Sequence, residues 1–148
     1  MADIFYQIVK NKIFMTTLSA WVIAQTIKVT IGVIRQKKFD FRWFVGTGGM
    51  PSSHASGASC LATAVGLEYG FGSVYFALAA AFAIVVMFDA QGVRRATGKQ
   101  ARILNKIMND IYWQGRIDET RLRELVGHTP IEVIGGFLLG VAIAFLAR

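Results

Sequence analysis

Charged residues are scarce in this chain of 148 residues, and cysteine and histidine are scarcer still. Charged side chains make up 17% of the residues, against roughly 25% in average soluble domains. A single cysteine, Cys60, excludes an internal disulfide, and its apolar surroundings predict a small buried side chain. The few carboxylates form no cluster suited to Mg²⁺.

Long runs without charged residues are the main feature of the sequence. They lie at residues 13–27, 54–67, 71–88 and 133–147, with lengths of 15, 14, 18 and 15 residues. Each is shorter than the roughly 20 residues that cross a bilayer, so any one alone fits a buried helix of a soluble protein. Four of them in a chain with 54% hydrophobic residues and a mean hydropathy of +0.47 leave too little polar surface for a soluble globule. We therefore predict an all-α, polytopic membrane bundle forming a single domain over residues 1–148.

The breaks between these runs define the expected elements, with no repeat and no strand-like alternation. About four membrane-crossing helices are predicted, at residues 12–36, 53–69, 73–95 and 130–148. An N-terminal interfacial helix is expected at 3–12. A cytoplasmic amphipathic helix is expected at 99–113, where apolar residues recur at spacings of one, three and four.

Basic residues are divided unevenly between the two ends of the predicted bundle. Lys10, Lys12 and Arg148 fall on one side, and the other 13 of the 16 lysines and arginines fall on the side that carries the polar loops. The positive-inside rule makes that second side cytoplasmic. We therefore predict a protein of the cell (inner) membrane whose polar motifs gather at the cytoplasmic face.

Both histidines stand beside predicted helix starts on this face. At 47–54 the chain reads TGGMPSSH, where a serine and the backbone amides of a helix start favour an anion. At 127–132 it reads GHTPIE, in which Thr129 and Glu132 form a capping box. A serine N-cap and a capping box explain these segments without any function. They do not explain why each segment also carries a histidine, His54 and His128.

Residues 47–54, 89–99 and 125–136 together resemble the divergent PAP2 family, small membrane proteins related to type 2 phosphatidic acid phosphatases and vanadium haloperoxidases. The resemblance covers nearly the whole chain from the first long helix onward. Related phosphatases carry the blocks K-x6-R-P, P-S-G-H and S-R-x5-H-x3-D. Lys28 and Arg35 have the spacing of the first block, with Gln36 in place of proline.

The second block matches at Ser52 and His54, with Ser53 in place of glycine, and the third ends at His128 and Glu132, with glutamate in place of aspartate. Leu122 stands where the third block has its arginine. The arginines that could take this role flank Leu122 or lie in the segment particular to the divergent family: Arg94, Arg95, Arg121 and Arg123.

The resemblance implies a PAP2-like helical bundle and a phosphatase that uses no metal and no other cofactor. His128 would be the nucleophile that forms a phosphohistidine, His54 the proton donor and Glu132 the group that orients His128. The residues that would hold the phosphoryl oxygens are Lys28, Arg35, Ser52, Ser53, Arg94, Arg95, Arg121 and Arg123. Asp89 and Lys99 are possible supporting residues.

We accordingly predict a membrane phosphatase for a lipid phosphate or pyrophosphate. Phosphatidate, phosphatidylglycerophosphate and a polyprenyl pyrophosphate are all candidate substrates. The main alternative is a noncatalytic membrane protein that binds phospholipids or anions, and a carrier for an anionic metabolite is the third. Binding alone requires arginine and lysine but no nucleophile, so the histidine pair separates these classes. The expected partners are membrane lipids and further copies of the chain, and no nucleic acid.

Overall fold

The structure is a computed structural model that describes residues 2–37, 49–91, 98, 100–101, 103–105 and 128–148. Within this part of the chain every defined element is a helix: α1 (Ala2–Lys10), α2 (Lys12–Gln36), α4 (Ser53–Tyr69), α5 (Val74–Gln91) and α7 (Pro130–Leu146). The predicted all-α class is therefore confirmed for the described residues.

Residues with capping geometry mark the helix boundaries. The Asn11 side chain separates α1 from α2 and accepts a hydrogen bond from the backbone N–H of Phe14 at 3.0 Å. α2 ends at Lys37, whose left-handed backbone (φ 51°) lets its N–H donate to the Val33 carbonyl at 2.8 Å. After α4, Gly70 turns the chain with φ 87°, a conformation that favours glycine. These ends are fixed by local chemistry.

The predicted helices at 12–36 and 53–69 are confirmed, and the predicted N-terminal interfacial segment forms α1. The helix predicted at 73–95 is observed as α5, and 92–95 lie outside the described residues. Only residues 100–101 and 103–105 of the predicted surface helix at 99–113 are described, and they are helical.

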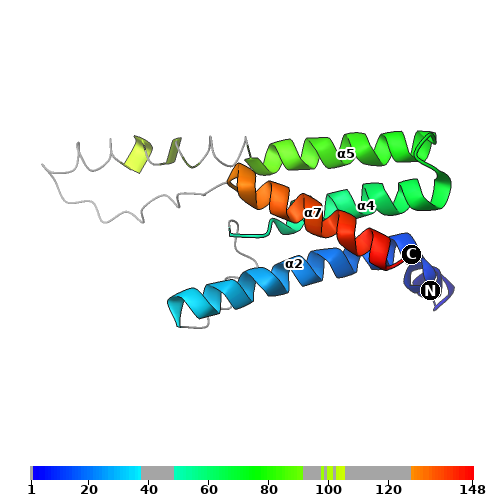
Figure 1. Cartoon of the computed structure of the whole chain (residues 1–148), viewed down its shortest axis with the longest axis horizontal. Helices are drawn as coiled ribbons and strands as arrows, with labels where there is room; N and C mark the ends of the chain where they lie inside the picture. The colour runs from blue at the N-terminus through cyan, green and yellow to red at the C-terminus, as the bar shows by residue number, and fades with distance from the viewer. Residues whose placement is uncertain (1, 38–48, 92–97, 99, 102, 106–127) are drawn as a thin grey trace, which may run out of the picture.

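α4 is the central helix, in contact with α2, α5 and α7 (Figure 1). Its small residues let the neighbouring helices approach closely. The Ser56 hydroxyl donates to the Ala20 carbonyl of α2 at 3.2 Å, and the Ser59 hydroxyl donates to the Phe137 carbonyl of α7 at 3.0 Å. Cys60 is fully buried in this core, as predicted. Hydroxyl-to-carbonyl bonds and small side chains thus hold α4 against two neighbours.

α7 approaches α4 most closely through two glycines one turn apart. A Cβ on Gly136 would meet the Ser52 carbonyl oxygen, and a Cβ on Gly140 would meet the Ser56 carbonyl oxygen. Both obstacles are backbone atoms, which cannot rotate away. This close approach sets where α7 begins relative to α4.

We expect Gly140→Ala to destabilise the bundle by about 1–3 kcal/mol, because overpacking against fixed backbone forces the two helices apart. The measurement is the melting temperature in detergent. Gly135→Ala is the matched control, since its Cβ would meet only the mobile end of the Met50 side chain. Equal melting temperatures for the two variants would contradict the close contact between α4 and α7.

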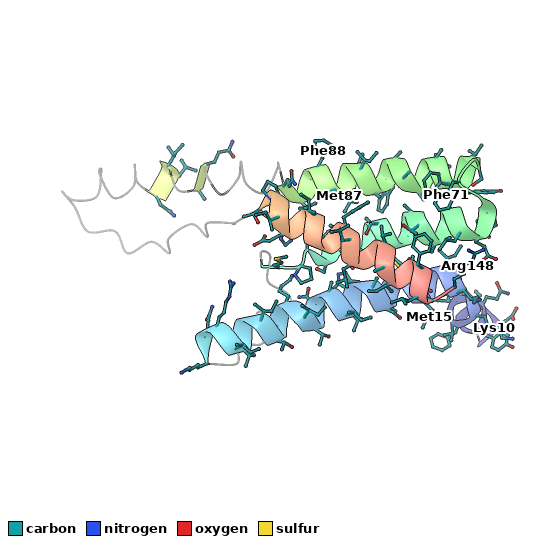
Figure 2. All side chains as sticks on the ribbon, viewed as in Figure 1. Lys10, Met15, Phe71, Met87, Phe88 and Arg148 are labelled. Atoms are coloured by element: carbon teal, nitrogen blue, oxygen red, sulfur yellow. The ribbon has the colours of Figure 1, made fainter. Side chains whose placement is uncertain are left out.

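α2 and α5 are long and apolar enough to cross a membrane, with 25 and 18 residues. Only 22% and 11% of their most apolar windows are buried, whereas the core helix of a soluble protein is mostly buried. Phe88 of α5, for example, is 72% exposed and points away from the bundle (Figure 2). α4 and α7 have 17 residues each, roughly 25 Å at the helical rise. In the part of the chain that the structure describes, two of the four predicted membrane crossings, α2 and α5, are therefore long enough to span a membrane.

Candidate active site

The start of α4 carries the first candidate group. Ser52 is the N-cap, and its hydroxyl accepts the backbone N–H of Ala55 at 3.3 Å. Ser52 and Ser53 are both buried, whereas His54 is exposed. The predicted N-cap is confirmed, and the role of the serines in binding phosphate stays a prediction.

The start of α7 carries the second group. Thr129 and Glu132 form the predicted capping box: the Glu132 N–H donates to the Thr129 hydroxyl at 3.4 Å, and the Thr129 N–H donates to Glu132 Oε2 at 3.0 Å. The same Oε2 lies 3.0 Å from Nδ1 of His128. One carboxylate therefore both caps α7 and holds the imidazole of His128.

His128 is fixed from two directions. Its backbone N–H donates to the Ala90 carbonyl at the end of α5 at 3.1 Å, and its side chain is 1% exposed. A carboxylate can only accept, so Nδ1 carries the proton towards Glu132. In the neutral ring, Nε2 is then the nitrogen that holds a lone pair.

The two helix starts converge. The Ser52 N–H donates to the Glu132 carbonyl at 3.0 Å, which joins the start of α4 to the first turn of α7. The rings of His54 and His128 lie 6.2 Å apart between centroids, at 60° to each other. The two histidines of the chain, 74 positions apart in sequence (128 minus 54), therefore share one site.

The buried side chain of Lys28 lies beside the turn that leads into α4. Lys28 of α2 is only 9% exposed, and a Cβ on Gly49 would come within 3.1 Å of its Cγ, so the Lys28 side chain lies against the turn that leads into α4. Gly49 itself has φ 89°, which favours glycine at this approach. Arg35, the partner of Lys28 in the predicted block, is exposed in the last turn of α2, roughly 10 Å farther along the helix. The structure thus places Lys28 at the turn and leaves the role of Arg35 a prediction.

The last turns of α5 line a hollow beside His54. Asp89 lines a hollow together with His54, Ala90, Val85 and Val86. The exposed Asp89 therefore shares a hollow with the candidate proton donor, and its supporting role stays a prediction.

Five predicted site residues lie outside the described residues: Arg94, Arg95, Lys99, Arg121 and Arg123. Within the described residues, no three of the histidine, cysteine, aspartate and glutamate side chains gather as metal ligands do. The roles of these five residues and the independence from metal both stay predictions.

Gln25 is a polar residue that the sequence analysis missed. It is 4% exposed and stands three residues before Lys28, on the same face of α2. The available signal was its place in the helical stripe that leads to Lys28, because an amide side chain within a charge-free apolar run requires polar partners that lipid does not supply.

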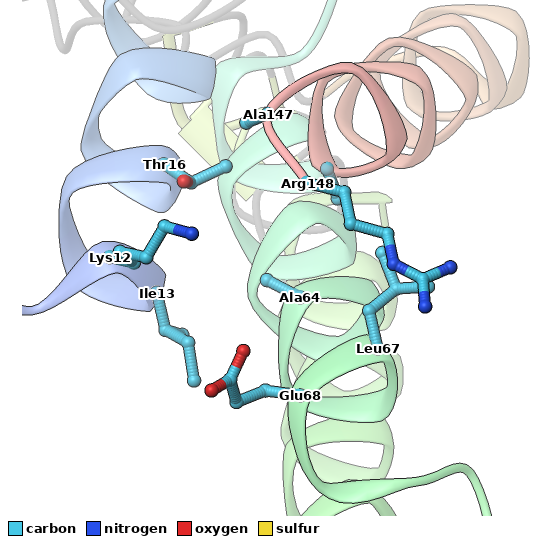
Figure 3. A pocket seen from close by; sticks show the side chains of 9 residues that line it. Lys12, Ile13, Thr16, Ala64, Leu67, Glu68, Ala147 and Arg148 are labelled. Atoms are coloured by element: carbon cyan, nitrogen blue, oxygen red, sulfur yellow. The ribbon is translucent and has the colours of Figure 1, made fainter.

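A separate pocket lies at the opposite end of the bundle. Figure 3 shows its lining by Lys12 at the start of α2, Glu68 near the end of α4, and Arg148 after α7. It contains charges of both signs and neither histidine. This pocket is therefore not part of the candidate site.

Comparisons with known proteins identify the family of the chain. A model described as the divergent PAP2 family matches residues 9–143, which include every candidate site residue. The chain belongs to the divergent PAP2 family. It is also 38% identical to YuiD of Bacillus subtilis (strain 168), described as an uncharacterized membrane protein, over 95% of this chain and 96% of YuiD. No solved structure matches the chain.

Proposed function

We propose that this protein is an integral membrane phosphatase that hydrolyses a lipid phosphate or pyrophosphate through a phosphohistidine. The observation that carries the proposal is the pairing of His54 and His128, with rings 6.2 Å apart and with Glu132 bonded to Nδ1 of His128. A binding site for an anion requires cations and amides, but it does not require a buried imidazole oriented by a carboxylate.

In the first step, Nε2 of His128 attacks phosphorus, and the Nε2–P bond forms as the bond from phosphorus to the alcohol oxygen breaks. The protonated imidazole of His54 gives its proton to the leaving alcohol. Glu132 accepts a hydrogen bond from Nδ1–H throughout, and its negative charge stabilises the positive charge that develops on the ring. The nucleophile is buried and the proton donor exposed, so the leaving group would depart towards the open side.

In the second step, water attacks the phosphohistidine. The now neutral His54 takes a proton from this water, the P–Nε2 bond breaks, and phosphate leaves with both histidines restored. Lys28, Ser52, Ser53 and the amides of the first turn of α4 would hold the phosphoryl oxygens, as would the arginines Arg35, Arg94, Arg95, Arg121 and Arg123.

The orientation that we propose has four crossings, with the histidine pair at the cytoplasmic face. Gln36→Cys, at the end of α2, should then react with a membrane-impermeant thiol reagent only from the cytoplasmic side. Gly72→Cys is the matched control on the opposite turn, where an added Cβ meets nothing within 4 Å. The native Cys60 is fully buried and should add little background. Labelling of Gln36→Cys from outside intact cells would overturn the orientation.

Purified full-length protein should release phosphate from at least one of phosphatidate, phosphatidylglycerophosphate or a polyprenyl pyrophosphate. Activity should survive EDTA, because side chains and amides rather than a metal ion neutralise the phosphoryl oxygens. Vanadate should inhibit, because it mimics the five-coordinate state of phosphorus. A strict requirement for Mg²⁺ would contradict the mechanism. Saturable binding without turnover on every member of the panel would favour the noncatalytic phospholipid-binding protein.

A further inference from the structure

An apolar groove extends from His54 along the side of the bundle between α2, α4 and α5. Residues of all three helices line it, among them Leu18 and Trp21 of α2, Gly57 and Ala58 of α4, and Phe82 and Val86 of α5. Thr17 also lines it, but its hydroxyl donates to the Ile13 carbonyl at 2.8 Å, so this side chain adds no unsatisfied polar group. The groove therefore continues from a site proposed for phosphate into a surface suited to hydrocarbon.

Contacts between the helices fix the register of this groove. Lys28 lies against Gly49, and the Ser56 hydroxyl bonds to the Ala20 carbonyl, so α2 runs antiparallel to α4. Phe14, at the far end of the groove, is seven residues before Trp21, roughly 10 Å along the helix. The groove thus extends away from Lys28, along the side of the bundle towards the N-terminal end of α2.

The helix faces along the groove change from apolar to polar at the level of the site. On α2, Leu18 and Trp21 are followed by the buried Gln25 and then Lys28, at spacings of three, four and three residues that keep one face. On α5, Phe82 and Val86 are followed by Asp89 at spacings of four and three. Such a change matches an amphiphile whose charged head lies at the histidines and whose tail lies along α2 and α5.

A glycine provides the depth of the groove. Gly57 lines its floor on α4, and a Cβ there would lie 3.8 Å from Cβ of Trp21, an ordinary contact. Alanine therefore fits at this position, whereas a longer side chain would occupy the space that the groove now offers.

The walls of the groove belong to the two helices of membrane-spanning length, most of whose apolar surface is exposed. We propose that the groove holds one hydrocarbon chain of the substrate, so that the protein selects long-chain lipid phosphates that diffuse in from the bilayer. This inference rests on the proposed function, because it takes the histidine pair as the place of the phosphate. Contact with the hydrocarbon chain would then favour lipid phosphates over water-soluble phosphate esters.

The test uses the full-length protein in lipid nanodiscs and a long-chain alkyl phosphonate with a diazirine at the end of its chain. The carbon–phosphorus bond is not hydrolysed, so binding is measured without turnover. Crosslinks should map to Phe14 and Phe82 and should be competed by unlabelled phosphonate. An alkyl alcohol with the same diazirine should label lipid-facing residues without saturation.

Gly57→Leu should reduce the competed crosslink at least about tenfold relative to Gly57→Ala, since losing contact with two methylene groups already accounts for that ratio. Leu18→Trp fills the groove from the partly exposed wall on α2 and should act in the same direction if Gly57→Leu folds poorly. Val22→Leu, exposed on another face of α2, is the control and should crosslink like the unmodified chain. In both filled variants the ratio of kcat/KM for long-chain over short-chain substrate should fall.

The outcomes separate the two proposals. A competed crosslink in the groove that Gly57→Leu weakens supports the inference even if no substrate is turned over. Turnover of lipid phosphates together with crosslinks outside the groove would overturn the inference without contradicting the proposed phosphatase activity. Absence of any competed crosslink at Phe14 or Phe82 in the unmodified chain would also overturn the inference.

Discussion

His128→Ala is expected to abolish turnover of every lipid phosphate, because it removes the atom that accepts the phosphoryl group. The loss should exceed the roughly 10²–10⁴-fold that removal of a proton donor causes. His128 is buried and bonded to Glu132, so its replacement also leaves a cavity beside the start of α7. The rate of phosphate release should therefore be measured together with the melting temperature.

Two substitutions in the capping box separate catalysis from stability. Glu132→Gln alters both the cap of α7 and the partner of the His128 ring, whereas Thr129→Ala removes the hydroxyl of the cap alone. Both should lower the free energy of unfolding by about 1 kcal/mol. Only Glu132→Gln should also slow phosphate release, and equal rates in the two variants would contradict an orienting role for Glu132.

His54→Ala should slow hydrolysis of an alkyl phosphate by about 10²–10⁴-fold while leaving the nucleophile in place. An aryl phosphate has a leaving group that barely requires a proton, so it should restore the first step in His54→Ala and not in His128→Ala. The measurement is the burst of released phenol, which reports this step before water attacks. His54 is exposed, so its replacement should leave the fold intact.

The assigned roles would be contradicted if the His54→Ala and His128→Ala variants responded alike to an aryl leaving group. Rescue of both variants by an aryl phosphate would mean that His128 is not the nucleophile. Rescue of neither would mean that His54 does more than donate a proton to the leaving alcohol.

Local features of the fold were predictable from the sequence because local chemistry determines them. The capping box of α7 depends on residues three apart, and the N-cap at Ser52 depends on one side chain and the turn before it. The bounds of α2 and α4 follow from the same kind of signal. The prediction that both histidines lie on one face rested on four expected crossings and the distribution of basic residues, and the structure brings the two rings together.

The geometry of the site was not predictable in this way, because it depends on the register between helices. The 6.2 Å between the rings of His54 and His128 depends on which turn of α7 meets α4, where Gly136 and Gly140 lie against the α4 backbone and the Ser52 N–H bonds to the Glu132 carbonyl. No local pattern encodes which turn of α7 meets which turn of α4. For the same reason, the spacing of Lys28 and Arg35 did not reveal that one is buried at the turn and the other exposed two turns beyond.

Trapping a phosphoryl group on His128 is the most direct test of the proposed mechanism. The full-length protein should be mixed with a lipid phosphate, quenched under alkaline conditions that preserve phosphohistidine, digested and analysed by mass spectrometry. We expect a phosphoryl group on His128, absent from His128→Ala and increased in His54→Ala supplied with an aryl phosphate, because the second step then lacks its base. Hydrolysis without any phosphohistidine, or with the label on another residue, would contradict the account.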